Sequence, residues 1–250
     1  MISNKNVLAI TLARGGSKSI YKKNIALLKN KPLISYTINA ALDSKYIDEY
    51  IISTDDKEIA DVAENLGATI PFLRPENLSS DTASSADALI HAVNAYEEIT
   101  KKKYDYIIEL MCTNPFKSGE MIDDIISTLD RNEKADAVIT VERLLDHHPA
   151  RIKKIENGYI RDFCVEEELE SRRQDLKPEA YIRNGNIYAL RRDLLMTQKA
   201  RYGTNFCVPY YKENIPSANI DEPSDFYKAE SLLNDCCLLY TSDAADDRSC

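Results

Sequence analysis

Short apolar runs alternate with stretches of helical period along most of this chain, and that alternation limits the folds it can adopt. Residues 7–12 form a nearly continuous apolar run, which suits a strand buried on both faces. A later segment spaces its apolar residues three and four apart, as one buried helical face requires, at Ala88, Leu89, Ala92 and Val93. Strands and helices that alternate in this way predict an α/β fold with a mostly parallel sheet covered by helices.

The same reading places the individual elements. Strands are expected at residues 7–12, 50–54, 69–72, 106–110, 137–141, 187–190 and 206–209, and helices at 33–42, 59–66, from about 84, 121–129 and 226–233. Asp55 or Asp56 is the expected N-cap of the second helix, and Gly67 its end. Residues 151–160 predict a hairpin that turns at Asn157-Gly158. We expect one domain over residues 1–235.

Composition excludes some partners. Hydrophobic residues make up 44% of the 250-residue chain, enough for a sizeable core, and the formal net charge is −9. A nucleic-acid-binding face needs clustered Lys and Arg, so this charge argues against nucleic acid as a partner. A small anion can still bind to a local basic cluster.

The first apolar run and the cysteine spacing predict the compartment in which the protein works. Residues 7–12 are too short for a signal-peptide core or a membrane span, and the cysteines show no metal-type spacing. We therefore expect a cytoplasmic protein with reduced thiols and no membrane partner.

Residues 236–250 form a tail that we expect to be non-native, because 237–247 resembles a translated sequencing adapter; the alternative is an ordinary polar tail.

The strongest chemical signal is the loop after the first strand. It contains Gly15, Gly16 and Ser17, and its positive charge comes from Arg14, Lys18, Lys22 and Lys23. Adjacent glycines let the backbone approach a ligand and point N–H groups at phosphate oxygens. The loop lacks the spacing of a Walker loop or a dinucleotide fingerprint, so the residues alone favour anion binding of unspecified type over a plain surface turn.

Two further segments have a functional and a structural interpretation. Residues 79–85, after Arg74, gather hydroxyls and Asp81 at a predicted helix start, where capping is the simpler explanation. Residues 219–225 place carboxylates after a predicted strand, where oxygen ligands suit Mg²⁺. The alternative there is a helix with Pro223 in its first turn.

Taken together, these motifs resemble the acylneuraminate cytidylyltransferases, the CMP-sialic acid synthetases. The resemblance covers about residues 5–233. It rests on motifs that follow one another in the family's order: Ala13-Arg14-x-x-Ser17-Lys18, Lys23-Asn24, Ser53-Thr54-Asp55, Arg74-Pro75-Glu76, residues 80–85, His147-His148-Pro149 and Asn184-Gly185-x-Ile187-Tyr188. It implies a Rossmann-like α/β fold, with an arm at about residues 145–185 that forms a homodimer. It also implies transfer of CMP from CTP to a sialic-acid-like nonulosonic acid, with release of pyrophosphate and help from Mg²⁺ or Mn²⁺.

The resemblance also implies roles for single residues. The triphosphate and nearby parts of the nucleotide would lie on the loop, at Arg14, Gly15, Gly16, Ser17, Lys18, Lys23 and Asn24. The cytosine pocket would be lined by Arg74, Ala83 and Ser85, and Asp221 with Asn219 would hold the metal. The sugar would face Met111, Arg151 and Tyr188, and Arg173 would reach the partner's site. Arg14, Lys18, Lys23 and Asp221 would carry the catalysis.

Two departures from the family pattern are visible. Met111 stands where related enzymes commonly have a sugar-facing glutamine, and its thioether cannot replace the amide hydrogen bonds. Asn219 stands where the first aspartate of an Asp-x-Asp pair is usual. A related enzyme for another sugar, such as 3-deoxy-manno-octulosonate or a sugar 1-phosphate, or for another nucleotide, is the alternative. His147 and His148 before Pro149 are expected to be structural rather than metal ligands or a general base.

Overall fold

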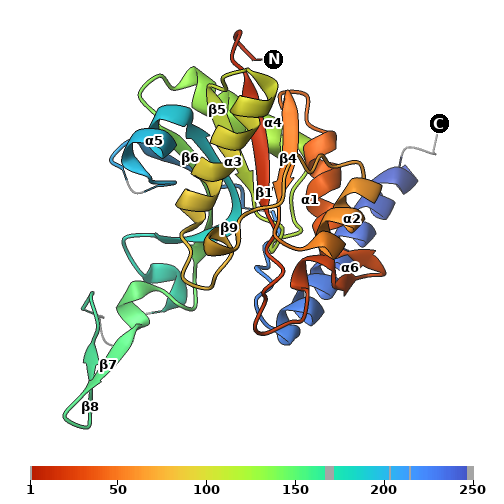
Figure 1. Ribbon diagram of the computed structural model, residues 1–250. Coiled ribbons are helices and arrows are strands. Elements are labelled where there is room, and N and C mark those ends of the chain that lie inside the picture. The colour runs from red at the N-terminus through yellow and green to blue at the C-terminus, as the bar shows by residue number, and fades with distance from the viewer. Residues whose placement is uncertain (1, 167–171, 203, 214, 247–250) are drawn as a thin grey trace.

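The computed structural model describes residues 2–166, 172–202, 204–213 and 215–246, and its centre is a six-stranded sheet (Figure 1). The strands lie in the order β10-β6-β9-β5-β1-β4, with bounds β1 Val7–Leu12, β4 Glu49–Ser53, β5 Tyr106–Leu110, β6 Ala137–Leu144, β9 Ala180–Arg191 and β10 Cys207–Tyr210. Only β9 runs antiparallel to its neighbours. The expected mostly parallel α/β sheet is therefore confirmed.

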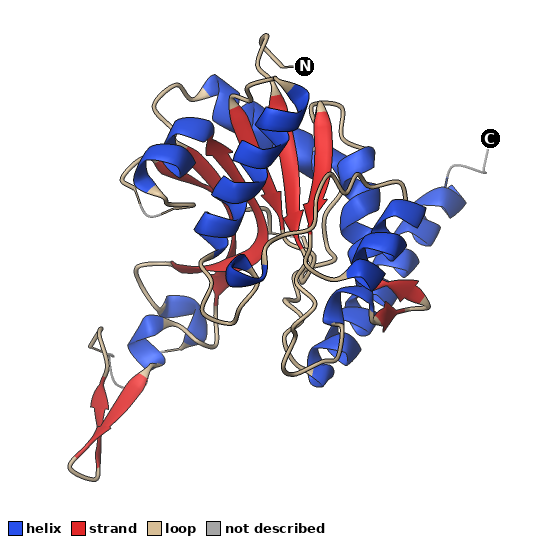
Figure 2. Cartoon of the chain, viewed as in Figure 1, coloured by secondary structure: helices blue, strands red, loops and turns tan. Residues whose placement is uncertain are grey.

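Helices cover both faces of this sheet (Figure 2). One face carries α1 (Leu33–Leu42), α2 (Lys57–Asn65) and α4 (Gly119–Arg131), and the other carries α3 (Ser85–Thr100) and α5 (Arg192–Gln198). Strand β1 shows why: Val7 and Ala9 enter the first core, and Leu8 and Ile10 the second. A strand buried on both faces needs such a continuous apolar run.

Local sequence signals set the helix ends that border the site. Asp56 caps α2, accepting hydrogen bonds from the backbone N–H groups of Glu58 and Ile59 at 2.8 and 3.1 Å. The Ser84 hydroxyl caps α3 through the N–H of Ala86 at 3.2 Å. Each cap satisfies backbone donors that have no partner inside the helix.

The structure corrects several expected boundaries. Residues 69–72 form no strand of the sheet; isolated bridges join Thr69 to Ile51 and Leu73 to Thr54. The short pair β2 (Leu27–Leu28) and β3 (Lys31–Pro32) and helix α5 were not expected, and single 3₁₀ turns lie at Lys23–Ile25, Glu76–Leu78, Pro149–Arg151 and Arg173–Asp175. Three or four apolar residues, as at 69–72, do not by themselves select a strand.

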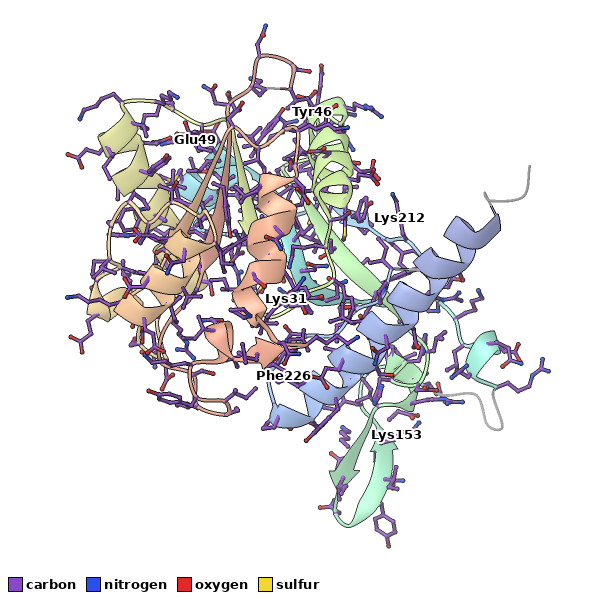
Figure 3. All side chains as sticks on the ribbon, turned by 90° about the vertical axis from the view of Figure 1, so that its right-hand side faces the viewer. Lys31, Tyr46, Glu49, Lys153, Lys212 and Phe226 are labelled. Carbon is purple, nitrogen blue, oxygen red and sulfur yellow. The ribbon has the colours of Figure 1, made fainter. Side chains whose placement is uncertain are left out.

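A hairpin projects from the body at the lower left of Figure 1. It consists of β7 (Lys153–Glu156) and β8 (Tyr159–Asp162), and Lys153, labelled in Figure 3, belongs to its first strand. Asn157 and Gly158 have φ of 54° and 81°, as the expected tight turn requires. Part of the predicted arm, residues 167–171, lies outside the described residues.

The last helix, α6 (Pro223–Asp246), is longer than the expected 226–233 and crosses the 235/236 boundary (Figure 3). Among its described residues, Phe226, Ala229, Leu232 and Leu233 make apolar contacts to the body, where they pack with Leu28 and its neighbours in a third small core. The side chains of residues 236–250 lie outside the described part, so the proposed non-native tail stays a prediction. None of the described helices combines the length and apolar character needed to cross a bilayer.

Candidate active site

A cavity of about 340 Å³ opens where β1 and β5 end and α3 begins. In open α/β sheets the carboxyl ends of parallel strands are the usual place for ligands. Eight of the predicted site residues line it, namely Arg14, Ser17, Lys23, Asn24, Arg74, Ala83, Ser85 and Met111, together with Leu12, Leu78, Ser80, Asp81, Ser84, Ala88, Glu109, Cys112 and Thr113. The cavity therefore joins the loop after β1, the loop before α3 and the end of β5.

Gly15 fixes the path of the loop after β1. A Cβ at Gly15 would lie 2.7 Å from Oδ2 of Asp56, so only glycine fits there. The Gly15 N–H donates to Oδ1 of Asp55 at 3.1 Å, so in this structure it points at a carboxylate. A Cβ added at Gly16 would meet no other atom within 4 Å, so a side chain at this position would point into open space.

Two cations of this loop meet one carboxylate across the cavity. Arg14 and Lys18 approach Asp81 at 3.0 and 2.7 Å, and Arg14 also donates to the carbonyl of Ser80 at 3.2 Å. The ion pair with Lys18, followed by that with Arg14, lowers the pKa of Asp81. Lys18 lies at the rim rather than in the lining, with its side chain 76% exposed.

Lys23 lines the cavity and contacts Asp221, which, like Asn219, is not one of the lining residues. The Lys23 ammonium donates to the carbonyl of Ile220 at 2.7 Å and to Oδ1 of Asp221 at 2.9 Å. Asn219 donates from Nδ2 to the other oxygen of Asp221. The helix α6 begins at Pro223, but Asp225 caps the preceding N–H groups, so the side chain of Asp221 stays free of that role.

The loop before α3 supplies a buried guanidinium. Arg74 is only 5% exposed; its Nε donates to the hydroxyl of Ser79 at 3.0 Å, and a terminal nitrogen lies 3.6 Å from Asp55. Burial lowers the pKa of Arg74 and Asp55 opposes this shift, so the guanidinium stays charged. Ser84 acts as the helix cap, while Ala83 and Ser85 on either side of it line the cavity.

Asn24 holds the loop against the end of β5. Its Nδ2 donates to the carbonyl of Arg14 at 2.9 Å, and its Oδ1 accepts from the Cys112 thiol at 2.8 Å. Burial raises the pKa of Cys112 to about 11, so the thiol remains protonated and donates. Both amide atoms of Asn24 are therefore used to shape the cavity.

Lys117, which the sequence did not single out, supports the segment that carries Met111. Its ammonium donates to the carbonyls of Met111 and Asn114 and to the hydroxyl of Thr37. Burial lowers the pKa of Lys117 to about 7. No sequence motif marks this residue: two of its partners are nearby backbone carbonyls, and the third, Thr37, lies 80 residues away.

Glu109 lines the cavity and was likewise not singled out by the sequence. It lies in β5, is 2% exposed and accepts from Nη1 of Arg201 at 2.6 Å. Burial raises the pKa of Glu109, and the fixed charge of Arg201 opposes that rise. Tyr188 faces Glu109 across the β5–β9 ladder and is buried behind the lining instead of in it.

The remaining predicted residues lie toward the arm. Arg151 closes the 3₁₀ turn Pro149–Arg151, and Arg173 pairs with Asp146 at 3.1 Å; neither lines the cavity. His148 is structural, as expected, because Nδ1 accepts from the N–H of Ala150 and Nε2 then donates to the carbonyl of Pro178 at 2.8 Å. No group of three or more His, Cys, Asp or Glu within the described ranges is arranged to hold a metal ion by itself.

Comparison with known proteins points to one family. Residues 8–243 match the family described as cytidylyltransferase. An N-acylneuraminate cytidylyltransferase of Escherichia coli is 30% identical over 228 residues, which are 90% of this chain and 52% of that protein. The CMP-N,N'-diacetyllegionaminic acid synthase of Legionella pneumophila is 30% identical over 236 residues, 91% of this chain and 96% of that protein.

A solved structure shares the fold. A CMP:2-keto-3-deoxy-manno-octonic acid synthetase complexed with CTP superposes with a TM-score of 0.68, covering 92% of this chain and 99% of that one, at 16% identity. At that identity the likeness concerns the fold alone. This chain spans about half of the E. coli relative but nearly all of the Legionella one.

Proposed function

This chain belongs to the cytidylyltransferase family, and we propose that it transfers CMP from CTP to a nonulosonic acid of the N-acylneuraminate or legionaminate type. In the proposed reaction the anomeric hydroxyl of the sugar loses its proton to solvent as its oxygen attacks the α-phosphorus of CTP. The bond from that phosphorus to the bridging oxygen breaks, and pyrophosphate leaves. The observation that carries the proposal is the cavity where Arg14, Lys23 and Arg74 converge at the end of the parallel strands.

The triphosphate belongs on the loop side of the cavity. It carries up to about four negative charges, and charge that develops on the leaving pyrophosphate is best stabilised by fixed cations. Arg14 and Lys23 line that side, and Lys18 reaches over the rim. Asp81 now neutralises Arg14 and Lys18, so a bound polyphosphate would take over these two cations.

The base belongs on the side formed by the loop before α3. Arg74 is held rigidly by Ser79 and Asp55, which keeps its donors in place for a carbonyl or ring nitrogen of cytosine. Ala83 and Ser85 leave room beside it. A base with the wrong pattern of donors and acceptors would leave buried groups unpaired, so CTP should be preferred over UTP.

We propose Asp221 as the protein ligand of Mg²⁺. Its carboxylate is 62% exposed beside Lys23, and Mg²⁺ commonly binds to one or two carboxylates plus substrate phosphates. Asn219 donates to Asp221 in this structure, so its part is to orient that carboxylate. When bound, Mg²⁺ or Mn²⁺ would supply positive charge beside the phosphates.

The sugar belongs at the end of β5 and toward the arm. Met111 lines the cavity there, with Tyr188 behind it, and Arg151 and Arg173 lie on the arm side. The hairpin exposes Ile155, Tyr159, Ile160 and nearby Phe163, each more than half accessible. Exposed apolar surface of this kind marks an interaction site, and we propose that it packs against a second copy of the chain.

The proposed nucleotide also supports a proposal for the compartment. CTP is available in the cytoplasm, where thiols stay reduced. Among the described residues, Cys112, Cys164 and Cys207 form no disulfide, which is compatible with such a compartment. We therefore propose a cytoplasmic enzyme.

A pyrophosphate-release screen tests this function. The purified protein is offered each of the four nucleoside triphosphates with Mg²⁺, against nine-carbon keto-sugar acids, 3-deoxy-manno-octulosonate and sugar 1-phosphates. Release that needs both CTP and a nine-carbon acid supports the proposal. Release with a sugar 1-phosphate or the eight-carbon acid, but with no nine-carbon acid, would favour the alternative enzyme and reject this one.

A further inference from the structure

Glu109 is an unusual residue for the place it occupies. It lies in a central strand whose other members, at 106–108 and 110, are all buried and apolar or aromatic, yet it carries a carboxylate into the cavity. Its Oε2 accepts the hydrogen bond from Arg201 at 2.6 Å. A buried charge of this kind is costly unless it is paired and hydrogen-bonded.

Arg201 is itself held in place by aromatic rings. Its guanidinium lies 5.1 Å from the centre of the Tyr188 ring and 5.9 Å from that of Tyr202, and Arg183 covers Tyr202 at 3.7 Å. Such cation–π contacts orient the guanidinium plane. Arg201 therefore neutralises the charge of Glu109. Because of this pairing, the carboxylate adds little repulsion toward an anionic ligand in the cavity.

One oxygen of this carboxylate remains available. In the part of the chain that the structure describes, no hydrogen bond reaches Oε1 of Glu109. An ionised carboxylate has acceptor capacity on both oxygens. Glu109 lines the cavity, so an acceptor at this position matches an N–H or O–H donor of a ligand bound there.

We propose that Glu109 is a specificity-determining residue for the acceptor sugar. Its Oε1 accepts a hydrogen bond from an acylamino N–H or a hydroxyl of the bound nonulosonic acid. The inference rests on the proposed function. The sugar is the source of the donor because Glu109, in β5, lies two residues before Met111, which also lines the cavity just after the strand ends, and pairs with Tyr188 across the ladder. The base side, in contrast, comes from the loop before α3.

The variant Glu109→Gln tests this contact by reversing its polarity. Arg201 has only donors, so the glutamine oxygen must face Arg201 and its NH₂ group must face the cavity. The KM for the sugar should rise about tenfold or more, while the KM for CTP should stay within about threefold. Glu97→Gln is the matched control, because Glu97 is also a buried carboxylate, 5% exposed, that pairs with an arginine, Arg192, at 2.8 Å. Glu97 lies near the end of α3 that is remote from the cavity. It should change neither KM.

A second variant covers the case in which Glu109→Gln folds poorly. Glu109→Met with Arg201→Met removes the whole ion pair, a replacement that buried pairs often tolerate. It should show the same rise in the sugar KM. An unchanged sugar KM in a folded variant, or a rise confined to CTP, overturns the inference while leaving the function intact. A wild-type protein that releases no pyrophosphate with any sugar would overturn both.

Discussion

At the scale of single residues, the cations of the cavity are positioned by carboxylates from other segments. Asp81 holds Arg14 and Lys18, Asp221 holds Lys23, and Asp55 reaches both Arg74 and the N–H of Gly15. These contacts hold the cations beside the cavity in the absence of a ligand. A bound polyphosphate would then replace Asp81 as the partner of Arg14 and Lys18.

The two adjacent glycines give a matched pair of variants. Gly15→Ala would place a Cβ 2.7 Å from Asp56 and should lower stability by about 1–3 kcal/mol, a Tm decrease of several degrees. Gly16→Ala meets no protein atom within 4 Å and should leave the Tm nearly unchanged. If Gly16 faces the phosphates, its variant should still raise the KM for CTP. Calorimetry and steady-state kinetics on both variants check this, and equal Tm values for the two would contradict the packing argument.

Asp221 is the residue on which the metal assignment depends. Asp221→Asn should fold normally, because within the described residues its oxygens accept hydrogen bonds from Lys23 and Asn219 near the surface. Turnover at ordinary Mg²⁺ should fall about 100-fold or more if this carboxylate positions the cation. Mg²⁺ titrations of the rate, repeated with Mn²⁺, measure the effect. A variant with activity within a few-fold of wild type would rule Asp221 out as the ligand.

At the scale of elements, the sequence predicted most of the helices and the central strands but not how distant parts meet. Helix α1 and strand β5 begin and end where the period predicts, because their signals are local. The antiparallel direction of β9 has no such local signal. Glu109 sits within an apolar run, and its partner Arg201 lies 92 residues away, so only the fold reveals this pair.

Helix α6 makes its described core contacts before residue 235. Phe226, Ala229, Leu232 and Leu233 supply them, so a chain that ends after Asp235 should keep the third core. The Tm should change by no more than about 2 °C, less than about 1 kcal/mol, and activity should be retained. Thermal melts of the truncated and full chains decide this. A large decrease in Tm would mean that residues 236–246 pack on the body and that the non-native tail was a wrong interpretation.

At the scale of the whole molecule, the projecting hairpin should control assembly. Ile155 and Ile160 are directly opposite each other in the β7–β8 ladder and are 83% and 70% exposed. Changing both to Lys should convert a dimer into a monomer with an unchanged core, because charges oppose burial of that face. Light scattering after size exclusion measures the mass.

The hairpin also supplies its own control for this experiment. Lys154 and Arg161 are opposite each other on its other face, and changing both to Ser should leave the mass unchanged. A wild-type chain that is monomeric at micromolar concentration, or a double Lys variant that stays dimeric, would contradict the proposed arm.

The central claim is that the cavity joins CMP to a nonulosonic acid. The most direct measurement is to identify the product by mass spectrometry after incubation with CTP, Mg²⁺ and N-acetylneuraminate or N,N'-diacetyllegionaminate. We predict a CMP-linked sugar together with an equal amount of pyrophosphate. Binding of CTP without this product, or pyrophosphate release that does not require the sugar, would contradict the account.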